Sequence, residues 1–336
     1  MPKVSVIIPN YNHARFLEKR IQSVLNQTYQ DFEVIYLDDA STDNSNEVFA
    51  KFAGDKRIQA VYNESNSGSP FKQWNLGISL AQGDYVWIAE SDDYADKRLL
   101  AELVGRLDNN PTVGLAYCQS LIVDEYDNTK HTCNLDWIRS LDKERWQKDF
   151  INIGKNECQR YLIFGNTIPN ASAVLIRRSI YEEAGCVDET MRLCGDWMLW
   201  IKMLLLSDIA FVAEPLNYFR VHSGIVRHKA FINGVDVEES YHVLRHILGN
   251  LSFDRQVVEP LCEEMIDRWL YIVFSQEGKI SWERNYRIYK IASDIDSQLK
   301  LRLLKKTFLW WLRLIPPVRK IGHYVKYTLR SNYAKS

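Results

Sequence analysis

Three carboxylates stand within four residues of one another, at Glu90, Asp92 and Asp93. They follow residues 85–89, a short apolar and aromatic run that predicts a buried strand of a parallel sheet. Like charges this close are costly unless a cation lies among them, and carboxylate oxygens suit Mg²⁺ or Mn²⁺ brought in with a substrate diphosphate. The alternative is that these residues cap a helix beginning near Asp96, because Asp and Ser favour helix N-termini.

Polar residues also follow two other predicted strands. The β-branched run 3–9 leads to the polar residues 10–12, and residues 32–37 lead to Asp38 and Asp39. Apolar residues at helical spacing separate these runs, so the first third of the chain predicts strands alternating with helices around a mostly parallel sheet. Strand ends of such a sheet meet at one crevice, where ligands bind. We therefore expect the three polar clusters at one site.

Known phosphate-binding loops do not occur at these strand ends. The first strand is followed neither by G-x-G-x-x-G nor by G-x-x-x-x-G-K-[ST], which excludes the common dinucleotide and P-loop sites. A nucleotide would have to be held by carboxylate and amide contacts to its base and ribose, and through a metal on its phosphates.

The composition is that of an ordinary globular protein. The chain has 336 residues, 46% of them hydrophobic and 25% charged, and a net charge of −1 that gives no reason to expect nucleic acid as a partner. Its six cysteines are scattered without a C-x-x-C spacing, which favours reduced thiols in a cytosolic protein. No apolar run approaches the length of a membrane span, so we expect a cytoplasmic chain.

Four motifs occur in a fixed order: VSVIIPNYN at 4–12, DDASTD at 38–43, NLG at 75–77 and ESDD at 90–93. Together they resemble the family 2 glycosyltransferases. The resemblance implies the GT-A fold, which is an α/β fold with a Rossmann-like, mostly parallel sheet flanked by helices. It also implies a divalent cation, Mg²⁺ or Mn²⁺, and a nucleotide-diphosphate sugar as donor.

The resemblance assigns roles around the nucleotide. Pro9, Tyr11 and Asn12 would line the base pocket, and Asp39 would accept a hydrogen bond from the imide N–H of uracil or thymine. These roles imply a UDP- or dTDP-sugar donor. Lys72 lies beside Gln-Trp-Asn, where many relatives have Ala-Arg-Asn. It would replace the missing arginine at the phosphates, or it is simply a solvated helix residue.

Glu90 to Asp92 would correspond to the family's D-x-D motif. Asp92 would bind the metal, and Glu90 with Ser91 would contact the ribose or the metal. Glu90 departs from the usual Asp, which leaves its contact open. His222 lies in an Arg-Val-His element that resembles the family's Arg-x-His, where the His contacts the metal or pyrophosphate. A lone His can equally be structural.

Residues 193–204 combine a Gly-Asp pair with an apolar helix. Asp196 stands at the start of that helix, where Asp is normally a cap. The Gly-Asp-Trp-x-Leu-Trp pattern resembles the family's catalytic segment, in which this Asp is the general base. A cap and a base are compatible roles, and the resemblance makes Asp196 the catalytic residue.

The rest of the chain divides by pattern. Residues 112–123 predict a strand, and 208–213 with 216–220 predict two edge strands. We expect a catalytic domain over 1–225, with a nucleotide-sugar half at 1–110 and an acceptor half at 111–225. A helical extension over 226–296 and a basic tail over 297–336 follow.

The tail holds ten basic residues and no acidic one. Helical spacing puts Arg302, Lys305, Lys306 and Arg313 on one face and Leu301, Leu304, Phe308, Trp311 and Ile315 on the opposite face. This pattern predicts an interfacial helix within 298–335 on an anionic membrane. The alternative is a helix that packs in a core or in a homo-oligomer.

These observations predict an inverting, metal-dependent glycosyltransferase of the hexosyl-transferring type. It would act on the hydroxyl of a glycan or lipid-linked acceptor in surface polysaccharide synthesis, at the inner face of the plasma membrane. One alternative is a catalytically inactive sugar-nucleotide binding protein. Another is a sugar-nucleotide pyrophosphorylase, although these enzymes resemble one another in a Gly-rich loop after the first strand, and this chain has none there.

Overall fold

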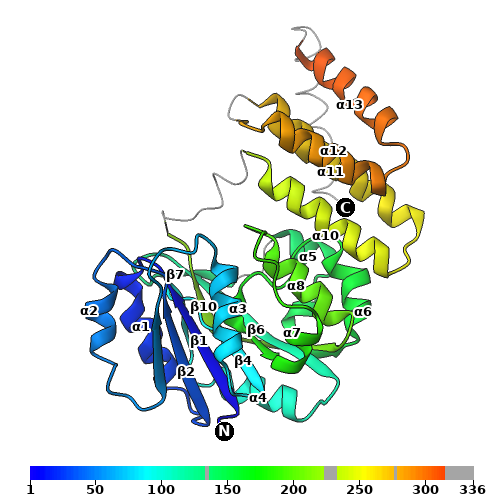
Figure 1. Cartoon of the computed structure of the whole chain (residues 1–336). Helices are drawn as coiled ribbons and strands as arrows, with labels where there is room; N and C mark the ends of the chain where they lie inside the picture. Colours follow the sequence, from blue (N-terminus) through cyan, green and yellow to red (C-terminus); the bar gives the residue numbers. More distant parts are fainter. Residues whose placement is uncertain (133–135, 223–232, 276–277, 315–336) are drawn as a thin grey trace. The chain divides into compact units, whose positions relative to one another are not determined.

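The structure is a computed structural model that describes residues 1–132, 136–222, 233–275 and 278–314. The chain forms two compact units, Met1–Arg227 and His228–Ser336, which are described separately. The first unit is α/β and the second is helical, so the predicted fold class with its C-terminal helical extension is confirmed (Figure 1).

A single sheet of ten strands runs through the first unit. Its strands are β1 (Val4–Asn10), β2 (Phe32–Asp38), β3 (Ile58–Tyr62), β4 (Tyr85–Ile88), β5 (Tyr94–Ala95), β6 (Val113–Val123), β7 (Thr129–Thr132), β8 (Phe150–Asn152), β9 (Val174–Arg177) and β10 (Asp208–Arg220). The order is β3-β2-β1-β4-β9-β6-β10-β5, with β7 paired to β6 and β8 paired to β10. Strands β1 to β4 are parallel, and β9 runs antiparallel between β4 and β6.

Helices cover both faces of this sheet (Figure 1). They are α1 (Ala14–Leu25), α2 (Ser45–Ala50), α3 (Pro70–Leu80), α4 (Leu99–Asp108), α5 (Asp136–Leu141), α6 (Gly154–Glu157), α7 (Arg178–Glu183) and α8 (Gly195–Leu204). Apolar residues of α1, α2 and α4 belong to the same buried cluster as alternate residues of β1, such as Val4 and Val6. On the other face α3 comes so close that a Cβ on Gly77 would lie 2.5 Å from Cγ2 of Ile7.

The register of the parallel strands aligns their polar ends. Strand β1 pairs with β2 from Val4 opposite Phe32 to Asn10 opposite Asp38. Asn10 Nδ2 donates to Oδ2 of Asp38 at 3.0 Å, which joins the two strand ends. The apolar runs therefore bring the polar residues that follow them to one edge of the sheet, as predicted.

One strand prediction was wrong. Residues 208–213 and 216–220 are not two edge strands but one strand, β10, which pairs along its length with β6 and also with β5 and β8. Its register with β6 shifts on both sides of Pro215. Proline has no N–H to donate to a neighbouring strand, and an irregularity of this kind accommodates it. Strand β10 therefore lies inside the sheet, and its C-terminal end reaches the polar edge.

The second unit is formed by the helices α10 (Val235–Asn250), α11 (Arg255–Phe274), α12 (Trp282–Ile295) and α13 (Leu299–Leu314). Apolar residues of α10 to α12 are buried, and ion pairs such as Arg268 to Asp236 at 3.0 Å add to the packing. No helix among the described residues combines the length and apolarity needed to cross a bilayer.

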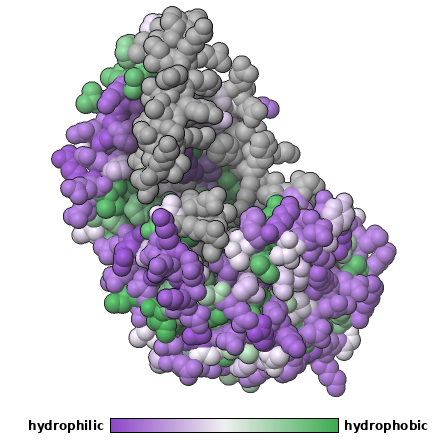
Figure 2. All heavy atoms as spheres, turned by 180° about the vertical axis from the view of Figure 1, so that it is seen from behind, coloured by the Kyte–Doolittle hydropathy of each residue, from purple (hydrophilic) through white to green (hydrophobic). Residues whose placement is uncertain are grey.

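The basic face of α13 differs from the prediction. Arg302 pairs with Asp296 at 3.0 Å and with Glu263, and Lys306 pairs with Asp267 at 2.7 Å. Two of the four bases expected to face a membrane are therefore engaged by acidic residues of the same unit. The other face of α13 is exposed at Leu301, Leu304, Phe308 and Trp311, and apolar side chains reach the surface of this unit in Figure 2. The side chain of Arg313 and residues 315–335 lie outside the part described.

Candidate active site

An open cavity of about 320 Å³ lies where the strand ends meet. Its wall is formed by residues that follow β1 and β4, by the first turns of α3 and α8, and by the end of β10. Four predicted site residues line it: Glu90, Asp92, Asp196 and His222. The predicted metal ligands and the predicted base thus share one cavity.

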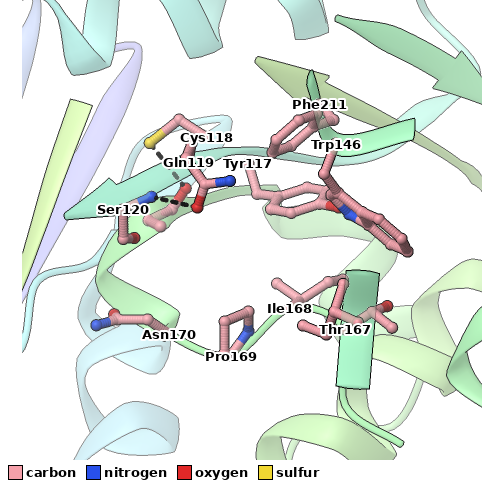
Figure 3. A pocket seen from close by; sticks show the side chains of 12 residues that line it. Tyr117, Cys118, Gln119, Ser120, Trp146, Thr167, Ile168, Pro169, Asn170 and Phe211 are labelled. Atoms are coloured by element: carbon pink, nitrogen blue, oxygen red, sulfur yellow. Dashed lines mark hydrogen bonds between the residues drawn. The ribbon is translucent and has the colours of Figure 1, made fainter. Parts of the chain in front are cut away.

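A second hollow lies under β6 and is shown in Figure 3. It is lined by Tyr117, Gln119, Trp146 and Thr167 among others, and its volume is about 10 Å³. Trp146 Nε1 donates to the hydroxyl of Tyr117 at 2.9 Å across its upper wall. This space is sufficient for about one water molecule, so it cannot be the donor site.

Glu90 is held from several sides. Its side chain accepts a 2.7 Å hydrogen bond from Nε1 of Trp74, and its amide donates to Oγ of Ser172 at 3.1 Å. Burial first, and then the charge of Asp92, raise the pKa of Glu90 to about 8. Trp74 stands where the resemblance led us to expect Arg, and its indole satisfies the carboxyl without adding a charge.

Asp92 and His222 form a pair at the mouth of the cavity. His222 Nε2 lies 3.2 Å from Oδ2 of Asp92. Burial acts to raise the pKa of Asp92, but the bond to His222 and the charge of His13 outweigh it and hold that pKa below its usual value. The same bond raises the pKa of His222, against a smaller opposing effect of burial.

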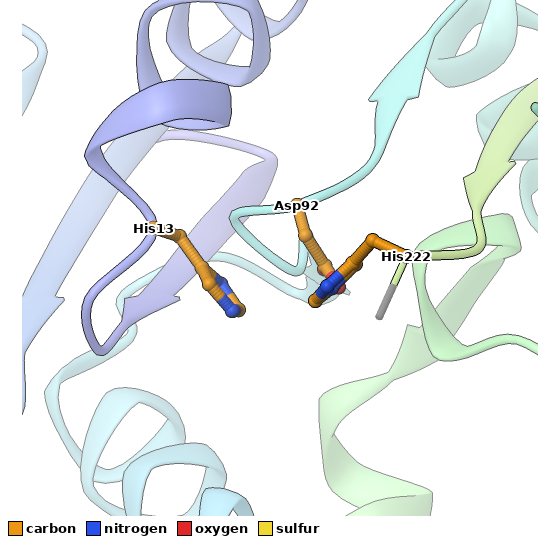
Figure 4. A group of neighbouring side chains, drawn as sticks. All are labelled: His13, Asp92 and His222. Atoms are coloured by element: carbon orange, nitrogen blue, oxygen red, sulfur yellow. The ribbon is translucent and has the colours of Figure 1, made fainter. Parts of the chain in front are cut away.

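Sequence reasoning missed His13. One ligand atom from each of His13, Asp92 and His222 lies within 4.8 Å of the others (Figure 4). Within the described part of the chain, this is the group of potential ligands close enough to hold a metal ion. The available signal was a lone His directly after the first strand. Burial lowers the pKa of His13, with the charge of Asp92 opposing.

Asp93 lies behind this group and is buried. It accepts hydrogen bonds from Nδ2 of Asn170 at 3.0 Å and from the amide of Arg220 at 2.8 Å, and the buried Arg20 lies 4.0 Å away. Burial, followed by the charge of Asp92, raises the pKa of Asp93 to about 6. Its contacts are those of a residue that holds the end of β10 in place.

The carboxylate of Asp39 is held by hydrogen bonds from within the protein, most of them to Oδ1. It accepts hydrogen bonds from Asn63 Nδ2, from Gln73 Nε2 and from both the amide and the hydroxyl of Ser67. Asp39 is buried and organises the loop between β3 and α3. In the first turn of α3, Lys72 Nζ donates to the carbonyl oxygen of Ser67 at 3.2 Å, and Lys72 is not among the residues that line the cavity.

The other predicted nucleotide-binding residues lie around the end of β1. Pro9 is buried in the strand, and Tyr11 has 44% of its surface exposed. Asn12 has a φ of 58°, and its Oδ1 accepts from the amide of Thr42 at 2.7 Å. Ser91 is buried, and its Oγ lies 2.8 Å from Nδ1 of His13.

Asp196 occupies the first turn of α8. Its Oδ2 accepts from Nδ2 of Asn166 at 3.0 Å, and its Oδ1 accepts from the amide of Trp197 at 2.7 Å. The preceding Gly195 packs against the ring of Phe71 so closely that an added Cβ would lie 2.5 Å from Cε2. Glycine thereby lets the helix begin beside the cavity.

Comparison with known proteins identifies the family of this chain. The model of Glycosyl transferase family 2 matches residues 5–185. The chain is 30% identical over 224 residues to an uncharacterized glycosyltransferase of Rickettsia typhi, covering 66% of this chain and 64% of that protein. It is 39% identical over 101 residues to the glycosyltransferase GlyG of Streptococcus pneumoniae, covering 30% and 33%. The chain thus spans just under two thirds of the Rickettsia relative.

Solved structures share the fold. TarS 1-349 of Staphylococcus aureus in complex with UDP-GlcNAc has a TM-score of 0.63 and 20% identity, over 90% of this chain and 84% of that one. The mannosyltransferase PcManGT of Pyrobaculum calidifontis, in complex with GDP-Man and Mn²⁺, has a TM-score of 0.53 and 16% identity, over 98% and 85%. These likenesses confirm the GT-A fold. Because the family model covers more than half of the sequence, the chain belongs to glycosyl transferase family 2.

Proposed function

We propose that this protein is an inverting, metal-dependent glycosyltransferase that moves a sugar from a UDP- or dTDP-sugar to a hydroxyl acceptor. The observation that carries the proposal is that Asp196 lines the same cavity as the pair formed by Asp92 and His222. The chemistry needs a base for the acceptor and a bound cation for the departing diphosphate. One cavity offers the base and residues that could hold the cation.

Asp196 acts as the general base. Its carboxylate takes the proton of the acceptor hydroxyl as that oxygen bonds to the anomeric carbon, and the bond from that carbon to the diphosphate oxygen breaks. The hydrogen bonds from Asn166 and from the Trp197 amide hold the carboxylate in one orientation. A single displacement inverts the anomeric centre, so no covalent nucleophile is required.

The donor end of the cavity fits a divalent cation. The carboxylate of Asp92 suits Mn²⁺ or Mg²⁺, the imidazole of His222 suits a transition ion such as Mn²⁺, and the two groups lie 3.2 Å apart. When bound, such an ion would neutralise the charge that develops on the departing diphosphate. Glu90, which lines the same wall, would contact the ribose.

The nucleotide would lie beyond this wall, over Pro9, Tyr11 and Asn12. Tyr11 offers an exposed ring to the base. Three of the four hydrogen bonds that Asp39 accepts end on Oδ1, and one, from the Ser67 hydroxyl, ends on Oδ2. Oδ2 therefore keeps acceptor capacity for an imide N–H, and this bond would discriminate uracil or thymine from cytosine.

The test is binding and transfer measured on the same variants. We expect UDP or TDP to raise the melting temperature when Mn²⁺ is present, and GDP and CDP to do so less. Asp92→Asn should lose this shift, whereas Asp196→Asn should keep it and lose sugar transfer. The anomeric configuration of the product, read by NMR, tests inversion.

The two alternatives give different results. If the protein only binds sugar nucleotides, the wild type would bind the donor but would transfer no sugar to an acceptor. A pyrophosphorylase would form the sugar nucleotide from a nucleoside triphosphate and a sugar phosphate. Absence of nucleotide binding in every metal condition would contradict the donor site itself.

We further propose that the protein docks on the inner face of the plasma membrane and acts on a glycan or lipid-linked acceptor in surface polysaccharide synthesis. Support comes from α13, where Leu301, Leu304, Phe308 and Trp311 are each more than half exposed. At 100° per residue the exposed Lys300 and Lys305 flank this apolar stripe. An apolar stripe with lysines at its borders suits an anionic bilayer surface.

Vesicle flotation tests this surface. We expect the protein to float with vesicles containing phosphatidylglycerol and not with pure phosphatidylcholine, and Leu304→Glu with Phe308→Glu to abolish flotation. Trp282→Glu, at an exposed position of α12, is the matched control. If the wild type fails to float but the double variant turns a dimer into a monomer, the stripe is a contact between copies of the chain.

A further inference from the structure

We infer that His13 is a third protein ligand of the metal centre, and that it makes the site selective for a first-row transition ion such as Mn²⁺ over Mg²⁺. The inference rests on the proposed function in that Asp92 and His222 bind a divalent cation. His13 is added to them by position: it reaches the same point from the end of β1, as Figure 4 shows.

The orientation of the His13 ring supports coordination. Nδ1 lies 2.8 Å from the hydroxyl of the buried Ser91, so Nε2 is the nitrogen left to face the cation. When Nδ1 donates its proton to that oxygen, the lone pair lies on Nε2, which is the arrangement found in metal-binding histidines. Ser91 thus supports the ligand from behind.

A purely structural role accounts poorly for this residue. His13 occupies the position just before α1, yet its side chain caps no amide of that helix. Its ring meets the ring of His222 edge to face, with centroids 5.8 Å apart and an interplanar angle of 85°. Two imidazoles and one carboxylate from three distant segments converge on one open cavity.

The ligand types decide the metal. Mg²⁺ strongly prefers oxygen ligands, whereas imidazole binds first-row transition ions better. A set of one carboxylate and two imidazoles also leaves coordination positions open for diphosphate oxygens and water. The second imidazole therefore shifts the preference away from Mg²⁺.

The decisive experiment is metal binding to the nucleotide-free protein, with pulsed EPR of bound Mn²⁺ as a second readout. We expect wild type to bind Mn²⁺ at least about tenfold more tightly than Mg²⁺, and His13→Asn to lose about that factor for Mn²⁺ alone. The EPR spectrum should show ¹⁴N couplings from two imidazoles in wild type and from one in His13→Asn. Asn is chosen because it suits the position before a helix.

Two controls complete the design. Ser91→Ala removes the support of the ring and should weaken Mn²⁺ binding without removing a ¹⁴N coupling. His131→Ala removes an exposed imidazole on β7 and should change nothing. Equal Mn²⁺ and Mg²⁺ affinities and an unchanged nitrogen count in His13→Asn would overturn the role of His13 while the Asp92 and His222 site stands. If wild type binds neither ion, that site fails as well.

Discussion

The backbone amide of Arg220 donates a 2.8 Å hydrogen bond to the carboxylate of Asp93, although 127 residues separate the two in the chain. Nε of Arg220 donates to the carbonyl oxygen of Asp92 at 2.7 Å. The end of β10 is thereby fastened to the loop after β4. Because His222 follows two residues after Arg220, this contact sets the distance between His222 and Asp92.

Replacing Asp93 by Ala should loosen both the fold and the site. The side chain is buried beside Arg20, and removing one partner from a buried charged group costs about 3–5 kcal/mol of unfolding free energy. Urea unfolding measures the loss, and Mn²⁺ titration measures the effect on the site. Asp93→Asn, which keeps the shape, should lose less. Unchanged stability in Asp93→Ala would show that the buried Arg20 needs no anion here.

Gly195→Ala tests the close approach of α8 to α3. The new methyl group would lie 2.5 Å from the ring of Phe71, and overpacking of this kind costs about 1–3 kcal/mol. Displacement of the adjacent Asp196 should also lower kcat by about a hundredfold, because small errors in position are costly in catalysis. Both thermal melting and turnover should be measured.

Gly105→Ala is the matched control for that substitution. Gly105 lies inside α4, and a Cβ there would meet nothing within 4 Å. Alanine should therefore raise the free energy of unfolding by about 0.5–1 kcal/mol, because it lowers the conformational entropy of the unfolded chain. Turnover should be unchanged. Similar losses at Gly105 and Gly195 would mean that the contact with Phe71 does not decide the outcome.

Asp196→Asn should separate catalysis from binding. Asn keeps the volume of the side chain but cannot take the acceptor proton, so kcat should fall by about 10²–10⁴-fold with little change in donor affinity. Single-turnover kinetics and nucleotide calorimetry measure the two effects. Asn166→Ala, which removes only the orienting hydrogen bond, should give a smaller loss. Comparable turnover in Asp196→Asn would exclude this residue as the base.

The ion pairs of α13 can be tested by exchanging charges. Arg302→Glu should weaken the docking of α13 on α11, because the new carboxylate would be repelled by the carboxylates of Glu263 and Asp296. Adding Glu263→Arg should restore part of the loss, with a coupling of about 0.5–3 kcal/mol. Amide hydrogen exchange of α13 in the full chain reports the docking. Additive effects of the two substitutions would show that these charges do not interact.

Sequence patterns predicted the parts of this fold that depend on local burial. Strands such as β1 and β4 consist largely of apolar residues and are buried along their length, so the sequence pattern alone predicts where they lie and which polar residues follow them. The single strand β10 was not predicted, because Pro215 interrupts the pattern and only the long partner β6 keeps the two segments in one strand.

The parts of the site that could not be predicted depend on contacts between segments that are distant in the sequence. A lone His forms no motif, and His13 can be recognised as a potential metal ligand only because the fold brings His222 beside it. Helical periodicity likewise assigned Arg302 and Lys306 to one face of α13. It could not show that Glu263 and Asp267 of α11 lie opposite that face.

The place of β10 in the sheet has a consequence for synthesis of the protein. Strands β1 to β4 come from neighbouring segments, so they can pair while later residues are still being translated. His222 leaves the ribosome only after β10, and it approaches Asp92 only once β10 has inserted beside β6. Chains stopped before residue 208 are therefore expected to bind no Mn²⁺ in the EPR experiment. An unfinished chain would therefore lack the completed site at which we propose that the donor binds.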